Sequence, residues 1–139
     1  MQSDVLFVCV GNMGRSQMAE GFFNHLAKNH KAMSAGIHAV HEMSKIIIDV
    51  MKEAGIDISK QMPKQLIADM VENTSRIIAM GDDVKKSNFL PVKLAENWHI
   101  PDPLGKTPEQ LKMIRDMIKE KVEKLVNELE NGENENIFQ

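Results

Sequence analysis

One short stretch near the N-terminus combines residue types suited to chemistry on an anion. Five residues separate Cys9 from Arg15, with Gly11 and Gly14 among them, and Ser16 follows directly. A loop of this length can curl around a tetrahedral anion so that several backbone N–H groups point inward, and glycine accepts the positive φ angles that such a curl needs. The planar guanidinium of Arg15 can hold two of the anion's oxygens. The stretch therefore predicts an oxyanion-binding loop made of Val10, Gly11, Asn12, Met13, Gly14, Arg15 and Ser16.

The surroundings of Cys9, the only cysteine in the chain, favour a nucleophilic sulfur. A helical pattern begins after Ser16, and the positive end of a helix and the nearby Arg15 both stabilise a thiolate. A hydrogen bond from the Ser16 hydroxyl would add to this effect. Because the thiolate is the attacking form of cysteine, we expect Cys9 to attack the anion that the loop holds.

Buried secondary structure on either side positions this loop. Residues 5–10 form an apolar run rich in β-branched side chains, which is typical of a central strand of a parallel sheet. After the loop, Met18, Phe22 and Leu26 fall on one stripe of a helix. Strand, loop and helix together predict the first half of a βα unit.

The rest of the chain continues the alternation of strands and helices. We expect strands at 32–36, 76–80 and 92–100, and helices at 44–54, 63–72 and from Thr107 onward. Gly55 stands where a left-handed residue ends a helix, and Thr107, Pro108 and Gln110 have the pattern of a helix start. This alternation predicts an α/β fold with a parallel sheet.

Charged residues outside the loop fall into three groups. Asp102 lies in a segment that Pro101 and Pro103 hold out of helical geometry. Asp82 and Asp83 follow the strand expected at 76–80, and we interpret them as turn and cap residues. A set of lysines is interpreted as a solvated face: Lys45, Lys52, Lys60 and Lys64.

Composition limits the function classes. The chain has 139 residues, of which 42% are hydrophobic and 27% charged, which suits one catalytic domain over residues 1–130 with a flexible tail at 131–139. The sequence has no run of 18 apolar residues and no signal-peptide pattern, and one cysteine suits a reducing compartment, so we expect a cytoplasmic protein. The net charge of −3 argues against nucleic acid or a membrane surface as a partner. The spacing of the five histidines predicts no metal site.

The residues resemble those of the low-molecular-weight protein tyrosine phosphatases and of the arsenate reductases that share their fold. The matching positions cover nearly the whole chain: Cys9, Gly11, Asn12, Arg15 and Ser16, then 17–21, 34–36, 55–59 and 102–103. This resemblance implies a single domain with a four-stranded parallel sheet and helices on both faces.

The resemblance also implies a role for each matching residue. Cys9 would be the nucleophile, Arg15 the oxyanion clamp, Ser16 a donor to the thiolate and Asn12 a residue that shapes the loop. Asp102 would be the general acid that protonates the leaving oxygen and later activates water. No cofactor is implied beyond an external thiol donor for a reductase.

The two branches of this resemblance differ in their other residues. The segments at 16–20 and 55–59, and Trp98 before Asp102, look more like arsenate reductases, and the chain has no tyrosine, whereas phosphatases of this type usually carry one or two after Asp-Pro. Thioredoxin-coupled reductases of this fold use two further cysteines after the third strand, but residues 80–88 contain none. A reductase of this sequence would therefore need thioredoxin, glutaredoxin or a small thiol from outside.

Three functions follow from these observations. The first is an arsenate reductase that works with an external thiol. The alternative is a phosphatase acting on phosphotyrosine or small aryl phosphates through a phosphocysteine, which needs only Cys9, Arg15, Asp102 and water. The third is a non-catalytic phosphate-binding module, and Asp102 discriminates against it because a binder needs no general acid.

Overall fold

The fold is described from a computed structural model. It gives the backbone of residues 3–85 and 95–137 and the side chains of residues 3–84 and 96–132. The elements, in chain order, are β1 (Ser3–Cys9), α1 (Arg15–Leu26), β2 (Ala32–Gly36), α2 (Lys45–Glu53), α3 (Ala68–Glu72), β3 (Thr74–Ala79), α4 (Asp82–Lys85), β4 (Ala95–Asn97) and α5 (Pro108–Ile137).

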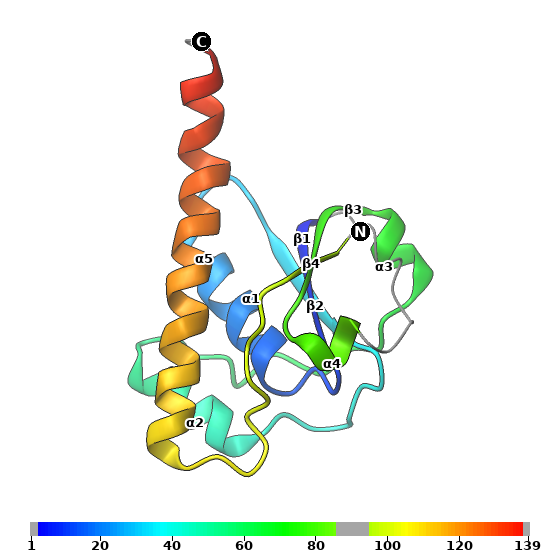
Figure 1. The fold of residues 1–139 in the computed structure, drawn as a ribbon, viewed down its shortest axis with the longest axis vertical. Helices are drawn as coiled ribbons and strands as arrows, with labels where there is room; N and C mark the ends of the chain where they lie inside the picture. Colours follow the sequence, from blue (N-terminus) through cyan, green and yellow to red (C-terminus); the bar gives the residue numbers. More distant parts are fainter. Residues whose placement is uncertain (1–2, 86–94, 138–139) are drawn as a thin grey trace.

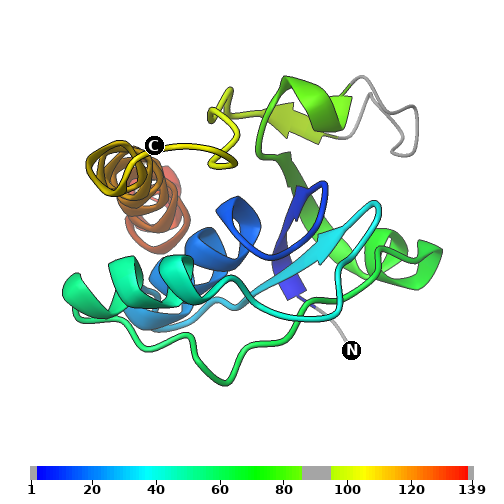
Figure 2. The ribbon, with the colours of Figure 1, turned by 90° about the horizontal axis from the view of Figure 1, so that it is seen from below.

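The four strands form one parallel sheet in the order β2-β1-β3-β4. The helices lie on both faces, with α1, α2 and α5 on one side and α3 on the other (Figures 1 and 2). The expected α/β fold with a four-stranded parallel sheet is confirmed. Because parallel strands all end at one edge, β1, β3 and β4 deliver the segments that follow them to the same end of the molecule.

The core forms where β1 and α1 meet α5. Val5 to Val8 are fully buried, and Phe22 and Phe23 of α1 pack between this strand and α5. The ring of Phe7 lies 6.1 Å from that of Phe23 and 5.4 Å from that of Trp98. The aromatic contacts therefore connect the central strand to α1 and to the segment after β4.

Most of the expected elements are confirmed in place. β2 has the predicted bounds, α2 lies within the predicted 44–54, and Gly55 has the predicted left-handed conformation, with φ 84°. At the start of α5, the Gln110 amide donates to Oγ1 of Thr107 and the Thr107 amide donates to the Gln110 side chain. This reciprocal pair is the capping box that the sequence predicts.

The predicted helix at 63–72 is wrong over its first half. Only Ala68–Glu72 is helical, and the chain before it runs beside the end of β2, where the Gly36 amide donates to the Lys64 carbonyl and the Leu66 amide to the Gly36 carbonyl. Leu66 is buried, whereas its neighbour Ile67 is exposed. Backbone pairing with the sheet replaces the helical hydrogen bonds here.

Two other expectations concern segments near the ends of the structure. The strand expected at 92–100 is observed only as Ala95–Asn97, and residues 92–94 lie outside the described residues. The backbone of α5 continues to Ile137, through most of the segment expected to form a tail. This helix runs the length of the molecule and projects beyond the sheet (Figure 1).

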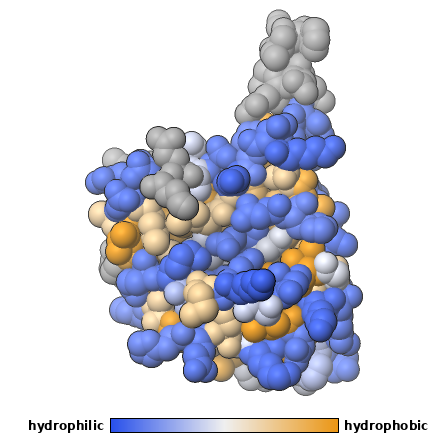
Figure 3. Space-filling view, turned by 180° about the vertical axis from the view of Figure 1, so that it is seen from behind, coloured by the Kyte–Doolittle hydropathy of each residue, from blue (hydrophilic) through white to orange (hydrophobic). Residues whose placement is uncertain are grey.

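One face of the molecule is mostly polar. On the face shown in Figure 3, hydrophilic residues surround several separate apolar patches. Within residues 3–85 and 95–137, no helix is both long and apolar enough to cross a bilayer.

Candidate active site

A crevice opens at the end of the sheet where β1, β3 and β4 terminate. It has a volume of about 400 Å³ and is lined by Cys9 at the end of β1, by the loop after it, by Asp83 at the start of α4 and by Asp102 in the chain after β4. The predicted nucleophile, clamp and general acid, Cys9, Arg15 and Asp102, therefore line one cavity although they are distant in sequence.

The sulfur of Cys9 lies at the floor of this crevice. Cys9 is only 3% exposed, its Sγ lies 2.7 Å from Oγ of Ser16, and the backbone amide of Asn12 donates to Sγ at 3.2 Å. Helix α1 begins at Arg15 and directs its unpaired N-terminal amides towards the loop. These donors are arranged to stabilise negative charge at the sulfur and on an anion beside it.

The loop adopts its curl at a different residue from those predicted. Asn12 has φ 55°, whereas Gly11 and Gly14, which were expected to supply positive φ, do not. Asparagine tolerates this region better than other side chains, and here hydrogen bonds hold the side chain. The implied loop-shaping role of Asn12 therefore has a visible basis, and the prediction for the two glycines is wrong.

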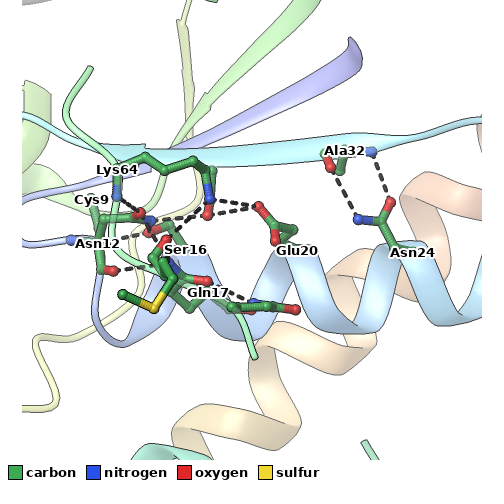
Figure 4. A network of polar contacts seen from close by, with 11 residues as sticks. Cys9, Asn12, Ser16, Gln17, Glu20, Asn24, Ala32 and Lys64 are labelled. Carbon is green, nitrogen blue, oxygen red and sulfur yellow. Dashed lines mark hydrogen bonds and ion pairs between the residues drawn. The ribbon is translucent and has the colours of Figure 1, made fainter. Parts of the chain in front are cut away.

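Hydrogen bonds behind the loop fix the Asn12 amide group (Figure 4). Its Oδ1 accepts from the Lys64 backbone amide at 2.7 Å and from Nε2 of Gln17 at 3.0 Å, and its Nδ2 donates to the hydroxyls of Ser16 and Ser34 at 2.8 and 2.9 Å. The side chains of Asn12 and Ser16 are fully buried and lie behind the crevice. They support the loop from the protein side, while Val10, Gly11, Met13 and Gly14 face the cavity.

Arg15 is held by contacts from two later segments of the chain. Its Nη1 donates to Asp83 Oδ1 and to the Ile100 carbonyl, both at 3.0 Å, and its Nη2 donates to Asp83 Oδ2 at 2.6 Å. A guanidinium has five N–H groups, so these contacts use three of them. The other two, on Nε and Nη2, share one edge, which has the spacing to bind two oxygens of an anion.

The pair of Arg15 and Asp83 also sets their charge states. Burial acts to raise the pKa of Asp83, but the hydrogen bond and charge of Arg15 outweigh it and hold that pKa below its ordinary value. Burial acts to lower the pKa of Arg15, and the hydrogen bond and charge of Asp83 outweigh it, with smaller contributions from Cys9 and Asp102. Both groups therefore stay charged at neutral pH.

Asp102 stands at the mouth of the crevice. Its side chain is exposed, and Oδ1 accepts a hydrogen bond from the Leu104 amide at 3.0 Å, which closes a short turn. The carboxylate lines the crevice, where it can exchange a proton with a bound group.

The walls of the crevice beside the loop are aliphatic. The apolar side chains that line it are Val10, Met13, Val40, Ile46, Ile47, Pro103, Leu104 and Leu111. Leu104 is 78% exposed and Ile46 is 44% exposed, so the apolar surface reaches the rim. Among the described residues, no group of three or more His, Cys, Asp or Glu side chains is placed to hold a metal ion.

Sequence reasoning missed two parts of this site. Asp83 is interpreted from sequence as a turn residue, yet it binds the clamp. Its place directly after a predicted parallel strand was the available signal, because parallel strands all end at one edge of the sheet. Lys64 was assigned to a solvated face, yet its backbone amide binds Asn12 and its ammonium lies 3.5 Å from Glu20. The contacts of Asp83 with Arg15 and of Lys64 with Asn12 each join residues more than 50 positions apart, which no local pattern encodes.

Comparisons with known proteins agree with this geometry. Residues 4–135 match the family described as low molecular weight phosphotyrosine protein phosphatase. An arsenate reductase of Staphylococcus aureus (strain Newman) is 34% identical over 122 residues, covering 86% of this chain and 92% of the relative.

Solved structures with the same fold include phosphatases of two kinds. A low molecular weight protein tyrosine phosphatase from T. tengcongensis has a TM-score of 0.81 at 30% identity, covering 91% of this chain and 99% of that one. The YwlE arginine phosphatase from Geobacillus stearothermophilus has a TM-score of 0.85 at 26% identity and covers 96% of both chains.

Proposed function

The chain belongs to the low molecular weight phosphotyrosine protein phosphatase family, and from this membership we propose that it reduces arsenate to arsenite with an external thiol. It is an enzyme of the type that includes arsenate reductases and these phosphatases. The identity to arsenate reductases over most of both chains supports the choice of arsenate. We expect it to act in the cytoplasm, where thiol donors are kept reduced.

The first step forms a bond between sulfur and arsenic. Arsenate binds in the loop, with two oxygens on the outer edge of Arg15 and others on the backbone amides. The Cys9 thiolate attacks arsenic, the bond from arsenic to one hydroxyl group of the arsenate breaks, and that hydroxyl takes a proton from Asp102 and departs as water. Arsenic remains pentavalent and is now attached to Cys9.

The second step transfers two electrons and needs a thiol from outside. The thiolate of the donor attacks the Cys9 sulfur, a disulfide forms between donor and Cys9, and the electron pair of the As–S bond stays with arsenic, which leaves as arsenite. A second donor thiol then attacks the mixed disulfide and releases the Cys9 thiolate. Each turnover consumes two thiols and yields one disulfide, one arsenite and water.

One observation carries this proposal. The sulfur of the only cysteine accepts from the Asn12 amide at 3.2 Å, contacts the Ser16 hydroxyl at 2.7 Å and shares its crevice with Arg15. These contacts favour an attacking thiolate. Since no other residue of the chain can form a disulfide with Cys9, the resolving thiol must be external.

Arsenite production tests the proposal directly. Purified protein is given arsenate with each of three donors: thioredoxin with its reductase, glutaredoxin with glutathione, or a small dithiol. We expect arsenite with at least one donor, and we expect Cys9→Ser to form none while it still binds sulfate or phosphate. Absence of arsenite with all three donors would overturn the arsenate assignment.

A phosphatase activity is the second candidate, and the aliphatic walls of the crevice favour it. Arsenate has no organic group to contact Ile47, Leu104 or Leu111, whereas a phosphate ester would place its organic part against them. Here Cys9 attacks phosphorus, Asp102 protonates the departing alcohol, and water then hydrolyses the phosphocysteine with Asp102 as the base.

The same purified protein separates the two activities. Hydrolysis of p-nitrophenyl phosphate and of phosphoarginine is measured beside arsenite production, with Cys9→Ser in each assay. Ester hydrolysis with no arsenite would select the phosphatase, and arsenite with negligible hydrolysis would select the reductase.

A further inference from the structure

Glu20 is a buried carboxylate that the steps above do not use. It lies one turn along α1 from Ser16, is 9% exposed and faces β2 rather than the crevice. The Ser34 hydroxyl donates to its Oε1 at 2.9 Å, and Nζ of Lys64 lies 3.5 Å from the same oxygen (Figure 4). A carboxylate removed from water needs such partners, and here one of them leads back to the nucleophile.

Groups that can only donate or only accept a hydrogen bond fix the direction of the other hydrogen bonds in this network. The backbone N–H of Lys64 can only donate, so the Asn12 atom that it contacts is the amide oxygen. The Asn12 nitrogen therefore faces Ser16 and Ser34 and gives one hydrogen to each hydroxyl. Both serine oxygens act as acceptors towards Asn12.

Each serine then has one hydrogen left to donate. When Cys9 is a thiolate, its sulfur can only accept, so the Ser16 hydrogen points to that sulfur, 2.7 Å away. The Ser34 hydrogen points to Glu20, which as a carboxylate can only accept. The chain of donors thus runs from the Asn12 amide in two branches, one that ends on Cys9 and one that ends on Glu20.

The carboxylate is what allows Ser34 to act as an acceptor towards Asn12. Without it, the Ser34 hydrogen would be buried without a partner or would turn towards the Asn12 nitrogen, which is itself a donor. Either result weakens the hold on the Asn12 amide and with it the alignment of Ser16. The ammonium of Lys64 lies 3.5 Å from the same carboxylate oxygen and forms an ion pair with it.

We propose that Glu20 is a positioning residue for Cys9: by accepting the Ser34 hydrogen it fixes the Asn12 amide, so that the Ser16 hydroxyl donates to the sulfur. The consequence for turnover rests on the proposed function, but the effect on the sulfur itself does not.

The test measures the reactivity of Cys9 towards iodoacetamide without any substrate. In Glu20→Gln, the amide oxygen can keep the place of Oε1, but it is neutral, so it accepts more weakly from Ser34 and loses the ion pair with Lys64. We expect alkylation at neutral pH to slow about fivefold, the difference between a hydrogen bond to a charged acceptor and one to a neutral acceptor. An alkylation rate within about twofold of wild type would overturn the proposal.

The pH profile separates an orienting role from damage to the loop. Loss of thiolate stabilisation moves the profile towards alkaline pH and leaves the alkaline rate intact, whereas a distorted loop slows alkylation at every pH. The other charged or titratable side chains that line the crevice are the same in all variants and do not account for a difference between them: Arg15, His38, Asp83, Asp102 and Lys106. A uniform loss of rate, with weaker sulfate binding, would contradict the proposal.

Two further variants complete the test. Glu53→Gln is the matched control, since Glu53 also pairs with a lysine, Lys112 at 3.3 Å, but does not line the crevice; we expect a wild-type rate. In a Ser34→Ala background, Glu20→Gln should not slow alkylation further, because the hydrogen bonds that connect Glu20 to Asn12 through Ser34 are already absent. Additive losses would show that Glu20 acts by another route.

This experiment and the arsenite assay fail independently. Slower alkylation of Glu20→Gln in a protein that makes no arsenite would support the positioning role and reject the arsenate assignment. Arsenite production by the wild type, with an unchanged alkylation rate in Glu20→Gln, would support the arsenate assignment and reject the positioning role.

Discussion

The guanidinium of Arg15 is shared between the protein and an anion. Asp83 and the Ile100 carbonyl take the inner donors, which orients the outer edge before any anion arrives. A clamp held in this way loses little freedom on binding, so most of its interaction energy is available to the bound anion and to the transition state.

Replacing Asp83 tests this division of the guanidinium. In Asp83→Asn the charge-assisted pair becomes a neutral hydrogen bond, and we expect kcat/KM to fall about tenfold because Arg15 is less well oriented. Steady-state kinetics on the active substrate measure the loss. Asp82→Asn is the matched control, since Asp82 contacts His99 and Asn97 outside the crevice; an equal loss there would contradict the role of Asp83.

Asp102 differs from Asp83 in having no cation within its hydrogen bonds. A general acid must gain and lose its proton, so an exposed carboxylate with one oxygen occupied by the Leu104 amide suits that role.

The proton donor can be tested by the leaving group. If esters are hydrolysed, Asp102→Asn should slow phenyl phosphate about a hundredfold or more and p-nitrophenyl phosphate much less, because p-nitrophenolate leaves without a proton. If only arsenate is turned over, the variant should slow arsenite formation while sulfate binding persists. Equal losses for both esters, or an undiminished rate, would remove Asp102 from the mechanism.

At the scale of elements, the sequence predicts correctly those strands and helix ends that depend on residues close together in the chain. The apolar run before Cys9 and the Thr107 to Gln110 cap both depend on residues within one turn or strand, and both are confirmed. The helix predicted from residue 63 fails because the chain there pairs with the end of β2, some 30 residues earlier.

In the site too, features that depend on residues close in sequence were predicted, and features that depend on distant residues were not. Its loop was predicted because the nucleophile, clamp and helix start are contiguous, whereas Asp83 reaches Arg15 only through the order of strands in the sheet. The sequence indicates that β3 ends near Asp82 and Asp83, but it does not tell that β3 lies directly beside β1. The curl at Asn12 depended on a side-chain network that joins α1, β2 and the Lys64 segment.

Gly36, the last residue of β2, is the point where that strand meets the loop. A Cβ atom there would lie 2.7 Å from the Val10 carbonyl oxygen and 2.9 Å from the Asn12 nitrogen, both of which are backbone atoms that cannot move aside cheaply. We expect Gly36→Ala to displace the loop, lower the melting temperature and reduce anion affinity at least about tenfold. Thermal unfolding and sulfate titration measure both effects.

The control for Gly36 is a glycine with open space around it. A Cβ atom at Gly132, within α5, would meet no atom within 4 Å. Gly132→Ala should therefore leave anion binding unchanged and raise helix stability by up to about 1 kcal/mol. Wild-type anion affinity in Gly36→Ala would show that the loop does not depend on this close approach.

At the scale of the whole molecule, α5 connects the crevice to the opposite end of the sheet. It starts at Pro108, shortly after Asp102 and Pro103, and carries Leu111 into the crevice wall. Near its far end, Glu130 accepts hydrogen bonds from the backbone amides of Lys28 and Asn29 and lies 3.1 Å from Nδ1 of His30. The long helix is thus fixed at both ends, and its distal contact involves the segment between α1 and β2.

This distal contact predicts a pH-dependent loss of stability. Hydrogen bonds from Asn29 and Lys28 lower the pKa of Glu130 from 4.5 to about 2. Because the folded pKa is depressed, the contribution is fully present above pH 4.5 and is lost as the pH falls towards 2. Urea unfolding between pH 7 and pH 2 should show this loss in the wild type, whereas Glu130→Gln should be less stable at pH 7 and should change less over the acid range.

A surface glutamate on the same helix provides the comparison for Glu130. Glu120 pairs with Lys124 at 3.5 Å, and both side chains are more than 70% exposed, so Glu120→Gln should follow the wild-type curve closely. Since Glu130 is far along the helix from the crevice, its replacement should leave the alkylation rate of Cys9 unchanged at pH 7. Parallel unfolding curves for Glu130→Gln and the wild type down to pH 2 would show that the carboxylate does not hold α5 to the segment between α1 and β2.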